Sequence, residues 1–309
     1  MKILVTGGAG FIGSHIVDLL LTRGHEVVVV DNLITGQPAN LNPAARFYRL
    51  SINDTGLDEV FVKEKPQAVC HQAAHTVVTE SVADPIHDAH TNILGSLNVL
   101  RSCVRHHVER IVYASSCALY GNPVYMPVDE QHPVNPTSPY GVSKHTVEHY
   151  LGVYRHVFGL SYVALRYSNV FGPRQNQRGE AGVVAIFARQ MLRDEQPVIY
   201  GDGSKTRAYV YVADVARANL LALEGGCQGI YNIGTTEETS DQTVFDQLKR
   251  NLGWTGLPRY QEIRPGEIEH MALDCRRAQR ELCWEPQVSF ADGMAQTAAF
   301  YRAHAPLTV

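Results

Sequence analysis

Tyr140 and Lys144 are the two residues whose types and spacing most directly suggest chemistry. They follow Thr137, Ser138 and Pro139, which suit the cap and the first turn of a helix. On such a helix, residues four apart share one face, so the ammonium of Lys144 lies beside the phenol of Tyr140. A tyrosine ordinarily titrates near pH ~10, and a neighbouring cation favours its phenolate. The pair then makes a general base for a sugar or alcohol hydroxyl, although alone it is equally consistent with a chance surface pair.

The chain begins with a pattern that is typical of a dinucleotide site. An apolar strand at 3–6 opens onto Gly7, Gly10 and Gly13, and a helical stretch follows. This spacing provides a tight turn, close backbone approach to a pyrophosphate and a helix N-terminus that faces negative charge. A second apolar strand at 26–30 ends in Asp31, about 20 positions after the loop, where a carboxylate can hydrogen-bond an adenosine ribose. Because that carboxylate repels a 2′-phosphate, the pattern predicts NAD rather than NADP.

Composition excludes several other classes of function. The chain has 309 residues, which is enough for two lobes. Its net charge of −4 lacks the excess of basic residues that is typical of nucleic-acid binding. Its apolar runs have strand length, well below the ~20 residues of a membrane span, and the first strand leaves no room for a signal peptide. Six cysteines without a C-x-x-C pair predict reduced thiols and a cytoplasmic location. The histidine pairs 71/75 and 145/149 lack a third ligand, so we expect no metal site.

Strand and helix patterns alternate through the first half of the chain. Strands are expected at 45–50, 68–73, 110–115 and 161–167, and helices at 55–65, 86–107 and 139–158. This alternation predicts an α/β fold, a Rossmann-type doubly wound parallel sheet covered on both faces. After a loop at 169–182, we expect a helix at 183–192, a strand at 197–200, and strands at 209–212 and 230–233 that return to the main sheet. The expected division is an NAD-binding domain at 1–168 and, at 169–309, mainly a smaller C-terminal α/β substrate-binding lobe.

Two polar positions are expected near the predicted base. Ser115 and Ser116 lie where the strand at 110–115 ends, at the carboxyl edge of a parallel sheet, where ligands bind in such folds. A hydroxyl there can share a proton with both a substrate and Tyr140. Asn92 opens an otherwise apolar helical face.

Taken together, these motifs resemble the extended short-chain dehydrogenase/reductases, and within them the nucleotide-sugar epimerase/dehydratase branch. The resemblance is carried by 7–13, 31–32, 92–95, 115–121, 140–144 and 166–174, and it extends over nearly the whole chain. The stretches 172–187 and 200–203 are similar to those of bacterial UDP-glucose 4-epimerases.

The resemblance implies a role for each matched residue. Tyr140 is the base, Lys144 holds the nicotinamide ribose and lowers the tyrosine pKa, and Ser116 hydrogen-bonds the sugar. The implied NAD-binding residues are Gly7, Gly10, Phe11, Ile12, Gly13, Asp31, Asn32, Ile52, Gln72, Ala73, Ala74, Asn92, Tyr140, Lys144 and Tyr167. The implied substrate-binding residues are Val78, Ser116, Tyr140, Asn169, Val183, Tyr200, Arg207, Arg264, Glu267 and Met271. The helical stretches 86–107 and 139–158 match those that pair in the homodimers of this family.

The chain departs from the family pattern at a few positions. Ser51 stands where an aspartate often contacts adenine, and Ala208 replaces an aspartate beside Arg207. The loop at 76–78 is unusual. Met271 occupies the position that faces the hexose, where a small residue accompanies N-acetylated sugars and a bulky aromatic accompanies plain hexoses. The alternative is that Met271 is an ordinary core residue.

Cys117 and Ala118 follow Ser116, where dehydratases of this branch have carboxylates. Neither residue can act as a carboxylic acid, so elimination of water is disfavoured. The remaining reaction is oxidation at C4 followed by re-reduction at the same carbon. We therefore expect a UDP-glucose/UDP-galactose 4-epimerase that works through a transient 4-keto sugar. UDP-N-acetylglucosamine or UDP-glucuronate 4-epimerisation, 4-keto reduction of another nucleotide sugar, and a non-catalytic NAD-binding sensor or scaffold remain alternatives. The retention of Ser116, Tyr140 and Lys144 favours an enzyme.

Overall fold

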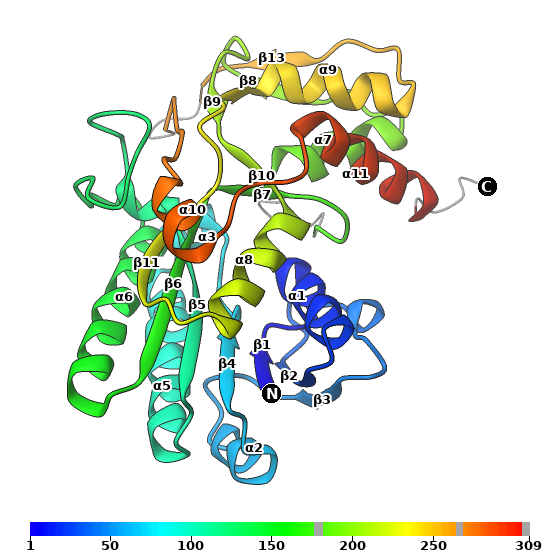
Figure 1. The fold of residues 1–309 in the computed structure, drawn as a ribbon. Coiled ribbons are helices and arrows are strands. Elements are labelled where there is room, and N and C mark those ends of the chain that lie inside the picture. The colour runs from blue at the N-terminus through cyan, green and yellow to red at the C-terminus, as the bar shows by residue number, and fades with distance from the viewer. Residues whose placement is uncertain (176–181, 264–267, 305–309) are drawn as a thin grey trace.

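The computed structural model describes residues 1–175, 182–263 and 268–304. Within these ranges, seven parallel strands form one sheet in the order β11-β6-β5-β4-β1-β2-β3 (Figure 1). The strands are β1 (Lys2–Thr6), β2 (Glu26–Asp31), β3 (Arg46–Arg49), β4 (Ala68–His71), β5 (Arg110–Ser116), β6 (Ser161–Tyr167) and β11 (Gly229–Ile233). The predicted doubly wound Rossmann-type sheet is thereby confirmed.

Helices cover both faces of the sheet, as the continuous apolar character of the strands requires. Ile3 and Val5 pack on one face with α1 (Phe11–Thr22) and α8 (Val212–Glu224). Leu4 points to the other face, where α2 (Leu57–Glu64), α5 (Gly95–Arg105) and α6 (Pro139–Phe158) complete the core. Figure 1 shows α5 and α6 side by side on one side of the sheet and α1 and α8 on the other.

A second core lies beyond the carboxyl ends of the main strands, at the top of Figure 1. Phe187, Phe245 and Met294 are buried there. They come from the helices α7 (Val183–Leu192), α9 (Asp241–Leu252) and α11 (Phe290–His304). The short strands of this part are β7 (Asn169–Phe171), β8 (Val198–Tyr200), β9 (Thr206–Arg207), β10 (Tyr209–Tyr211), β12 (Thr239–Ser240) and β13 (Arg259–Gln261). The remaining helices are α3 (Val78–Ala83), α4 (Pro85–Ala89) and α10 (Arg276–Leu282).

The structure differs from the sequence prediction at three points, the first being that the loop expected at 169–182 begins with the strand β7. The strand expected at 209–212 does not return to the main sheet: β10 pairs with β7 in a separate parallel ladder. The reason is that β6 already has β5 on one side and β11 on the other. The helix expected at 86–107 is divided into α4, a π-helical turn at His90–Leu94, and α5. The strand expected at 230–233 does join the sheet, as β11. The domain division at residue 168 stays a prediction.

A buried ion pair fastens α6 to the sheet. The Glu148 carboxylate accepts hydrogen bonds from Arg166 Nε at 2.9 Å and Nη2 at 2.6 Å, and from the Ser115 hydroxyl at 2.6 Å. Both charged side chains are almost fully buried. Burial alone raises the pKa of Glu148, but the hydrogen bonds and charge of Arg166, with the hydrogen bond from Ser115, outweigh it and lower the pKa from 4.5 to about 2.

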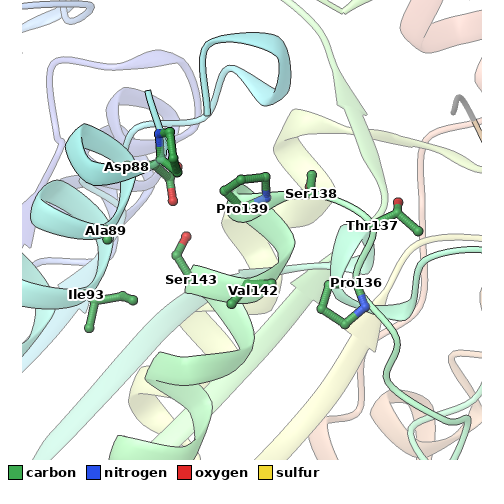
Figure 2. A pocket seen from close by; sticks show the side chains of 10 residues that line it. Asp88, Ala89, Ile93, Pro136, Thr137, Ser138, Pro139, Val142 and Ser143 are labelled. Atoms are coloured by element: carbon green, nitrogen blue, oxygen red, sulfur yellow. The ribbon is translucent and has the colours of Figure 1, made fainter. Parts of the chain in front are cut away.

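Apolar side chains are exposed on α4, on the π-helical turn before α5, and on α6. Ile86, Leu94, Val142, Val153 and Val157 are all exposed. A pocket of about 510 Å³ opens on this face between α4, the π-helical turn and the start of α6 (Figure 2). In the described part of the chain, every helix is too short or too polar to cross a membrane.

The ion pair makes a prediction about stability. Replacing Arg166 by methionine leaves the Glu148 carboxylate buried without its partner, so we expect a loss of ~3–5 kcal/mol in the free energy of unfolding, measured in urea. Replacing both residues, as Glu148→Gln with Arg166→Met, should restore much of that loss. Arg277→Met is the matched control, because Arg277 pairs with Glu281 at the surface and should cost no more than ~1 kcal/mol.

The same pair predicts a pH dependence. Because the folded-state pKa of Glu148 is depressed, its contribution is fully present above the unfolded value of 4.5 and is lost as pH falls towards about 2. Glu148→Gln should therefore lose less stability over this interval than the unmodified protein. Equal losses in the two proteins would contradict this account of the pair.

Candidate active site

The loop after β1 forms a concave surface of backbone atoms, here called the glycine cradle, because glycines leave no side chains there. Gly7 has φ +70, and a Cβ there would lie 2.7 Å from the backbone nitrogen of Ala73, while a Cβ at Gly13 would clash with the carbonyl oxygen of Gly7. The loop leads through Gly10 into α1, which starts at Phe11 and Ile12. Among the described residues, no side chain caps this helix and no acid lies in its first turn. Its first N–H groups are therefore free to face an anion, which fits the pyrophosphate of a dinucleotide.

Asp31 stands beside this cradle at the end of β2. One carboxylate oxygen accepts the N–H of Ala9 at 3.0 Å, and the other accepts the N–H of Leu33 at 2.8 Å. Burial raises the pKa of Asp31, and the two backbone hydrogen bonds partly offset this. The carboxylate is thus fixed next to the glycine loop, where the sequence predicts contact with an adenosine ribose. Asn32, which follows, is exposed and accepts the N–H of Ile34.

The other predicted cofactor residues lie along the same edge of the sheet. Gln72 follows β4, and its amide donates to the Asn219 side chain at 3.1 Å and to the Tyr167 hydroxyl at 3.3 Å. The Ala73 N–H donates to Thr6 Oγ1 at 3.2 Å, which places 73–74 beside the end of β1. Ile52 is buried in the core beneath.

Ser116, Tyr140 and Lys144 meet at the carboxyl end of β5. The Ser116 side chain hydrogen-bonds the Tyr140 phenol. Lys144 Nζ donates to the carbonyl oxygen of Ala114 at 2.7 Å and lies 5.7 Å from the centre of the Tyr140 ring. The Ser138 side chain accepts the N–H of Gly141 and so caps α6, which confirms the predicted start of this helix.

The pKa values of this pair differ from the sequence expectation. Burial raises the pKa of Tyr140 to about 12, and the hydrogen bond from Ser116 offsets only part of that rise. Burial lowers the pKa of Lys144 to about 8, opposed by the charges of Asp88 and Glu148. The pKa of Tyr140 is therefore raised overall because desolvation dominates, and the lowering contribution expected from Lys144 stays a prediction.

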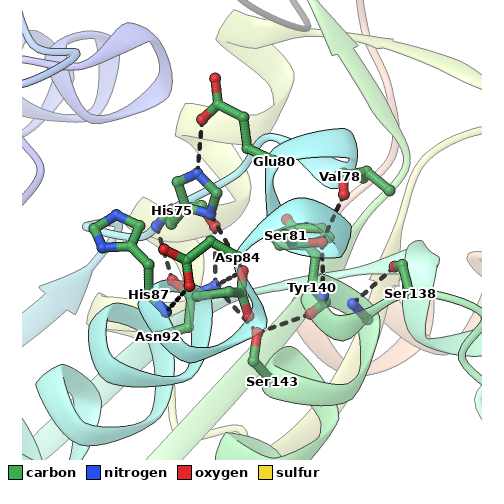
Figure 3. Close-up of polar contacts among 12 residues, drawn as sticks. His75, Val78, Glu80, Ser81, Asp84, His87, Asn92, Ser138, Tyr140 and Ser143 are labelled. Carbon is green, nitrogen blue, oxygen red and sulfur yellow. Dashed lines mark hydrogen bonds and ion pairs between the residues drawn. The ribbon is translucent and has the colours of Figure 1, made fainter.

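Asn92 links several segments below the base (Figure 3). It lies in the π-helical turn, its side-chain oxygen accepts the N–H of His75 at 2.7 Å, and its amide donates to the carbonyl oxygen of His75 at 2.9 Å and to Ser143 Oγ at 3.1 Å. These bonds occupy its side chain within the protein. Val78 begins α3, and its carbonyl oxygen accepts the Ser81 hydroxyl, which in turn accepts the N–H of Tyr140 at 3.3 Å.

The predicted substrate residues come from the second core. Asn169 opens β7 and its N–H donates to the carbonyl oxygen of Ala208 at 3.1 Å, so the alanine at 208 acts through its backbone. Arg207 on β9 acts electrostatically on Cys117, the neighbour of Ser116. Val183 begins α7 and Tyr200 ends β8. Arg264 and Glu267 lie outside the described residues.

Met271 is almost fully buried in a small cluster behind the active serine. The buried residues of this cluster are Leu119, Tyr120, Val128, Met271 and Leu273, and Cys117 packs against them. Burial raises the pKa of Cys117 to about 11, so at neutral pH its side chain is a thiol. A buried thiol of this kind is a poor proton acceptor, which favours a structural role for Cys117.

Sequence reasoning missed three buried polar residues that organise the site. Asn219 bonds Tyr167 and Gln72, Ser81 bonds the backbone of Tyr140, and Asp88 bonds Asn92. The available signal was the polar residue within an apolar stretch, which is uncommon in a core unless it is hydrogen-bonded. Among the described residues, no group of three or more His, Cys, Asp or Glu side chains is arranged to hold a metal ion.

Comparison with known proteins agrees with this geometry. The model of the NAD dependent epimerase/dehydratase family matches residues 3–234. A UDP-glucose 4-epimerase from Mycolicibacterium smegmatis is 40% identical over 311 residues, covering 98% of this chain and 99% of that protein. The structure of a UDP-glucose 4-epimerase from Thermotoga maritima with UDP-glucose has a TM-score of 0.97 and 45% identity, covering 99% of this chain and all of that one. The Thermus thermophilus UDP-glucose 4-epimerase in complex with NAD has a TM-score of 0.93 and 44% identity, covering 98% and 99% of the two chains.

The family model covers most of the chain, and the relatives match it along nearly its entire length. The glycine loop, Asp31 at the end of β2 and the cluster of Ser116, Tyr140 and Lys144 all lie within the matched residues. This chain belongs to the NAD dependent epimerase/dehydratase family.

Proposed function

We propose that the protein is an NAD-dependent UDP-sugar 4-epimerase that interconverts UDP-glucose and UDP-galactose, a reaction of galactose metabolism. The observation that carries this proposal is the meeting of Ser116, Tyr140 and Lys144 at the carboxyl edge of the sheet. The Mycolicibacterium smegmatis and Thermotoga maritima relatives, both UDP-glucose 4-epimerases, support this substrate over N-acetylated and uronate sugars.

NAD fits the residues that are present. The uncapped start of α1 and the glycines of its loop would hold the pyrophosphate, and Asp31 would hold the adenosine ribose, with Asn32, Ile52, Gln72, 73–74, Asn92 and Tyr167 along the remaining edge. When bound, NAD supplies the capacity to take a hydride from C4 of the sugar and to return it. The Asp31 carboxylate favours NAD because it repels the 2′-phosphate of NADP.

The protein groups handle the proton at the C4 oxygen. Tyr140 takes the proton of the C4 hydroxyl, and the Ser116 hydroxyl hydrogen-bonds the same oxygen and holds it beside the phenol. Lys144, whose ammonium is fixed on the Ala114 carbonyl, favours the phenolate that this step needs. When the keto sugar has presented its other face, Tyr140 returns the proton to the C4 oxygen, so no net redox change occurs.

The residues after Ser116 determine which reaction follows the oxidation. Cys117 is a buried thiol and Ala118 carries no functional group, so neither supplies the acid that elimination of water requires. Re-reduction at C4 is then the reaction that remains available to the 4-keto sugar. For the nucleotide, Arg207 and Arg264 would pair with the diphosphate, since guanidinium matches phosphate oxygens. Asn169, Val183, Tyr200 and Glu267 would line the rest of the nucleotide site, and Val78 and Met271 the sugar.

The function is tested with the purified protein and a panel of UDP-sugars. We expect interconversion of UDP-glucose and UDP-galactose, and we expect Tyr140→Phe to reduce turnover by ~10² or more, because a positioned general base contributes about that much. NAD binding and thermal stability should be unchanged in this variant. A protein that binds NAD and leaves every UDP-sugar unchanged would be the non-catalytic sensor instead.

We further propose that the protein is a cytoplasmic homodimer. The six cysteines are all free thiols, which is typical of a reducing compartment. The exposed apolar face of α4, the π-helical turn before α5, and α6, with the pocket between them, fits a second copy of the same helices in a four-helix interface. A self-complementary face of this kind is covered when two copies meet about a two-fold axis.

The assembly is tested by light scattering at micromolar concentration. We expect about twice the chain mass of 34.2 kDa for the unmodified protein, and Val153→Asp should shift it towards the monomer because a charge would be buried at the interface. Val62→Asp is the matched control, since Val62 is similarly exposed but lies on α2. A monomeric unmodified protein would contradict the proposal.

A further inference from the structure

We propose that Asp88 is a positioning residue for the Tyr140–Lys144 pair, which it holds in place through Asn92 and Ser143 and to which it presents a buried negative charge. The proposal deepens the proposed 4-epimerase function and rests on it, because it concerns the base of that reaction. Asp88 belongs to α4, outside the residues that the sequence assigned to the site.

Asp88 is almost completely removed from solvent, with an exposed fraction of 1%. One carboxylate oxygen accepts the amide of Asn92 at 2.9 Å and lies 3.3 Å from His75 Nδ1. The other nitrogen of His75 contacts the Glu80 carboxylate at 2.9 Å, which ties α3 to the same cluster (Figure 3). A buried carboxylate without a paired lysine or arginine in these contacts is costly, so its presence needs a physical reason.

The hydrogen bonds continue from Asp88 to the backbone of the base. The Asn92 amide that donates to Asp88 also donates to Ser143 Oγ at 3.1 Å, and the Ser143 hydroxyl donates to the carbonyl oxygen of Tyr140 at 2.9 Å. Asp88 therefore orients an amide whose other bonds hold the first turn of α6 and the segment at His75. A shift of this network would move the Tyr140 phenol relative to Ser116.

The charge of Asp88 acts on both members of the pair. Burial lowers the pKa of Lys144 to about 8, and Asp88 is the first of the two carboxylates that oppose this fall. Burial raises the pKa of Tyr140 to about 12, and the Asp88 charge adds to the rise. Glu148, the second carboxylate near Lys144, is already neutralised by Arg166. Asp88 faces His75 at 3.3 Å instead of a lysine or arginine, and it is the larger of the two charges that favour the protonated lysine.

The titratable groups that surround this cluster come from six segments. They are His71 on β4, His75 before α3, Glu80 on α3, His87 on α4, Tyr113 on β5, and Tyr140, Lys144 and Glu148 on α6. Burial lowers the pKa of His71 to about 3, so this imidazole is neutral at working pH. Tyr113 has its pKa raised well above its usual value by burial and stays neutral as well.

The test is the pH profile of kcat/KM for the NAD-loaded protein with UDP-galactose. Asp88→Asn keeps an oxygen that can accept from Asn92 and His75, so it removes the charge and preserves the shape. Without the charge, the pKa values of Tyr140 and Lys144 both fall. Both limbs of the bell-shaped profile should therefore move to lower pH, by ~1 unit, the lower end of what one nearby charge does.

Asp84→Asn is the matched control. Asp84 stands four residues earlier and accepts the N–H of His87 as the cap of α4, a role that asparagine fills equally well. It is exposed and has no contact with Asn92, so its profile should match that of the unmodified protein. Asp88→Ser is a second neutral variant, and it should show the same shift if Asp88→Asn fails to fold.

A second readout does not depend on turnover. The ultraviolet absorbance of the Tyr140 phenolate, obtained as the difference from the Tyr140→Phe protein, should titrate ~1 pH unit lower in the Asp88 variants. Unmoved limbs and an unmoved Tyr140 titration in the folded variants would overturn the proposal, even if activity fell. If the unmodified protein has no epimerase activity, the proposed function fails, and the absorbance titration alone then decides the role of Asp88.

Discussion

The partial removal of Tyr140 and the almost full removal of Lys144 from solvent is the constraint on which the rest of the site depends. Burial raises the pKa of the phenol to about 12 and lowers that of the ammonium to about 8, and so works against the two charged forms that proton transfer needs. A dry site strengthens every fixed dipole and charge within it, and it protects a keto intermediate from side reactions. The polar groups around the pair replace part of the stabilisation that water would give to the two side chains. Ser116 hydrogen-bonds the phenol, the Ala114 carbonyl accepts from the ammonium, and Asp88 and Glu148 add negative charge.

The fold provides the rigidity that such a site requires. The buried pair of Glu148 and Arg166 fixes α6 against β5 and β6, and Ser138 and Ser81 satisfy N–H groups in the first turn of α6. The glycine loop stands at the same edge of the sheet, where parallel strands end and ligands bind. One edge therefore carries both the glycine loop and the cluster of Ser116, Tyr140 and Lys144, and we propose that the second core beyond it supplies residues for the nucleotide sugar.

Local patterns were enough to predict much of the fold. The helix at 139–158 was predicted at its observed bounds, and Ser138 and Pro139 mark its start. The glycine spacing predicted the turn from β1 to α1, and the carboxyl end of β5 was predicted beside Tyr140. The predictions that failed concern features that depend on which elements are neighbours in space. The strand at 209–212 was assigned to the wrong sheet because nothing local reveals that β11 occupies the free side of β6.

The same distinction applies to the site. The types and spacing of Tyr140 and Lys144 predicted a base, whereas the direction of the Tyr140 pKa depends on how deeply the chain buries it, which no local pattern reports. Asp88 and Asn219 were missed because their partners come from distant segments. For Met271 the sequence left open a position facing the sugar and an ordinary core position, and its burial in the cluster that Cys117 packs against could not be predicted from its place in the chain.

The central claim is that one site removes the hydrogen at C4 and returns it to the same carbon on the opposite face. The most direct measurement uses UDP-glucose that carries deuterium at C4, in ordinary water, with the protein as purified. The account predicts that the UDP-galactose formed retains the deuterium at C4, because the hydrogen never exchanges with solvent. Product that has lost the label to water, or that carries it at another carbon, would contradict the account.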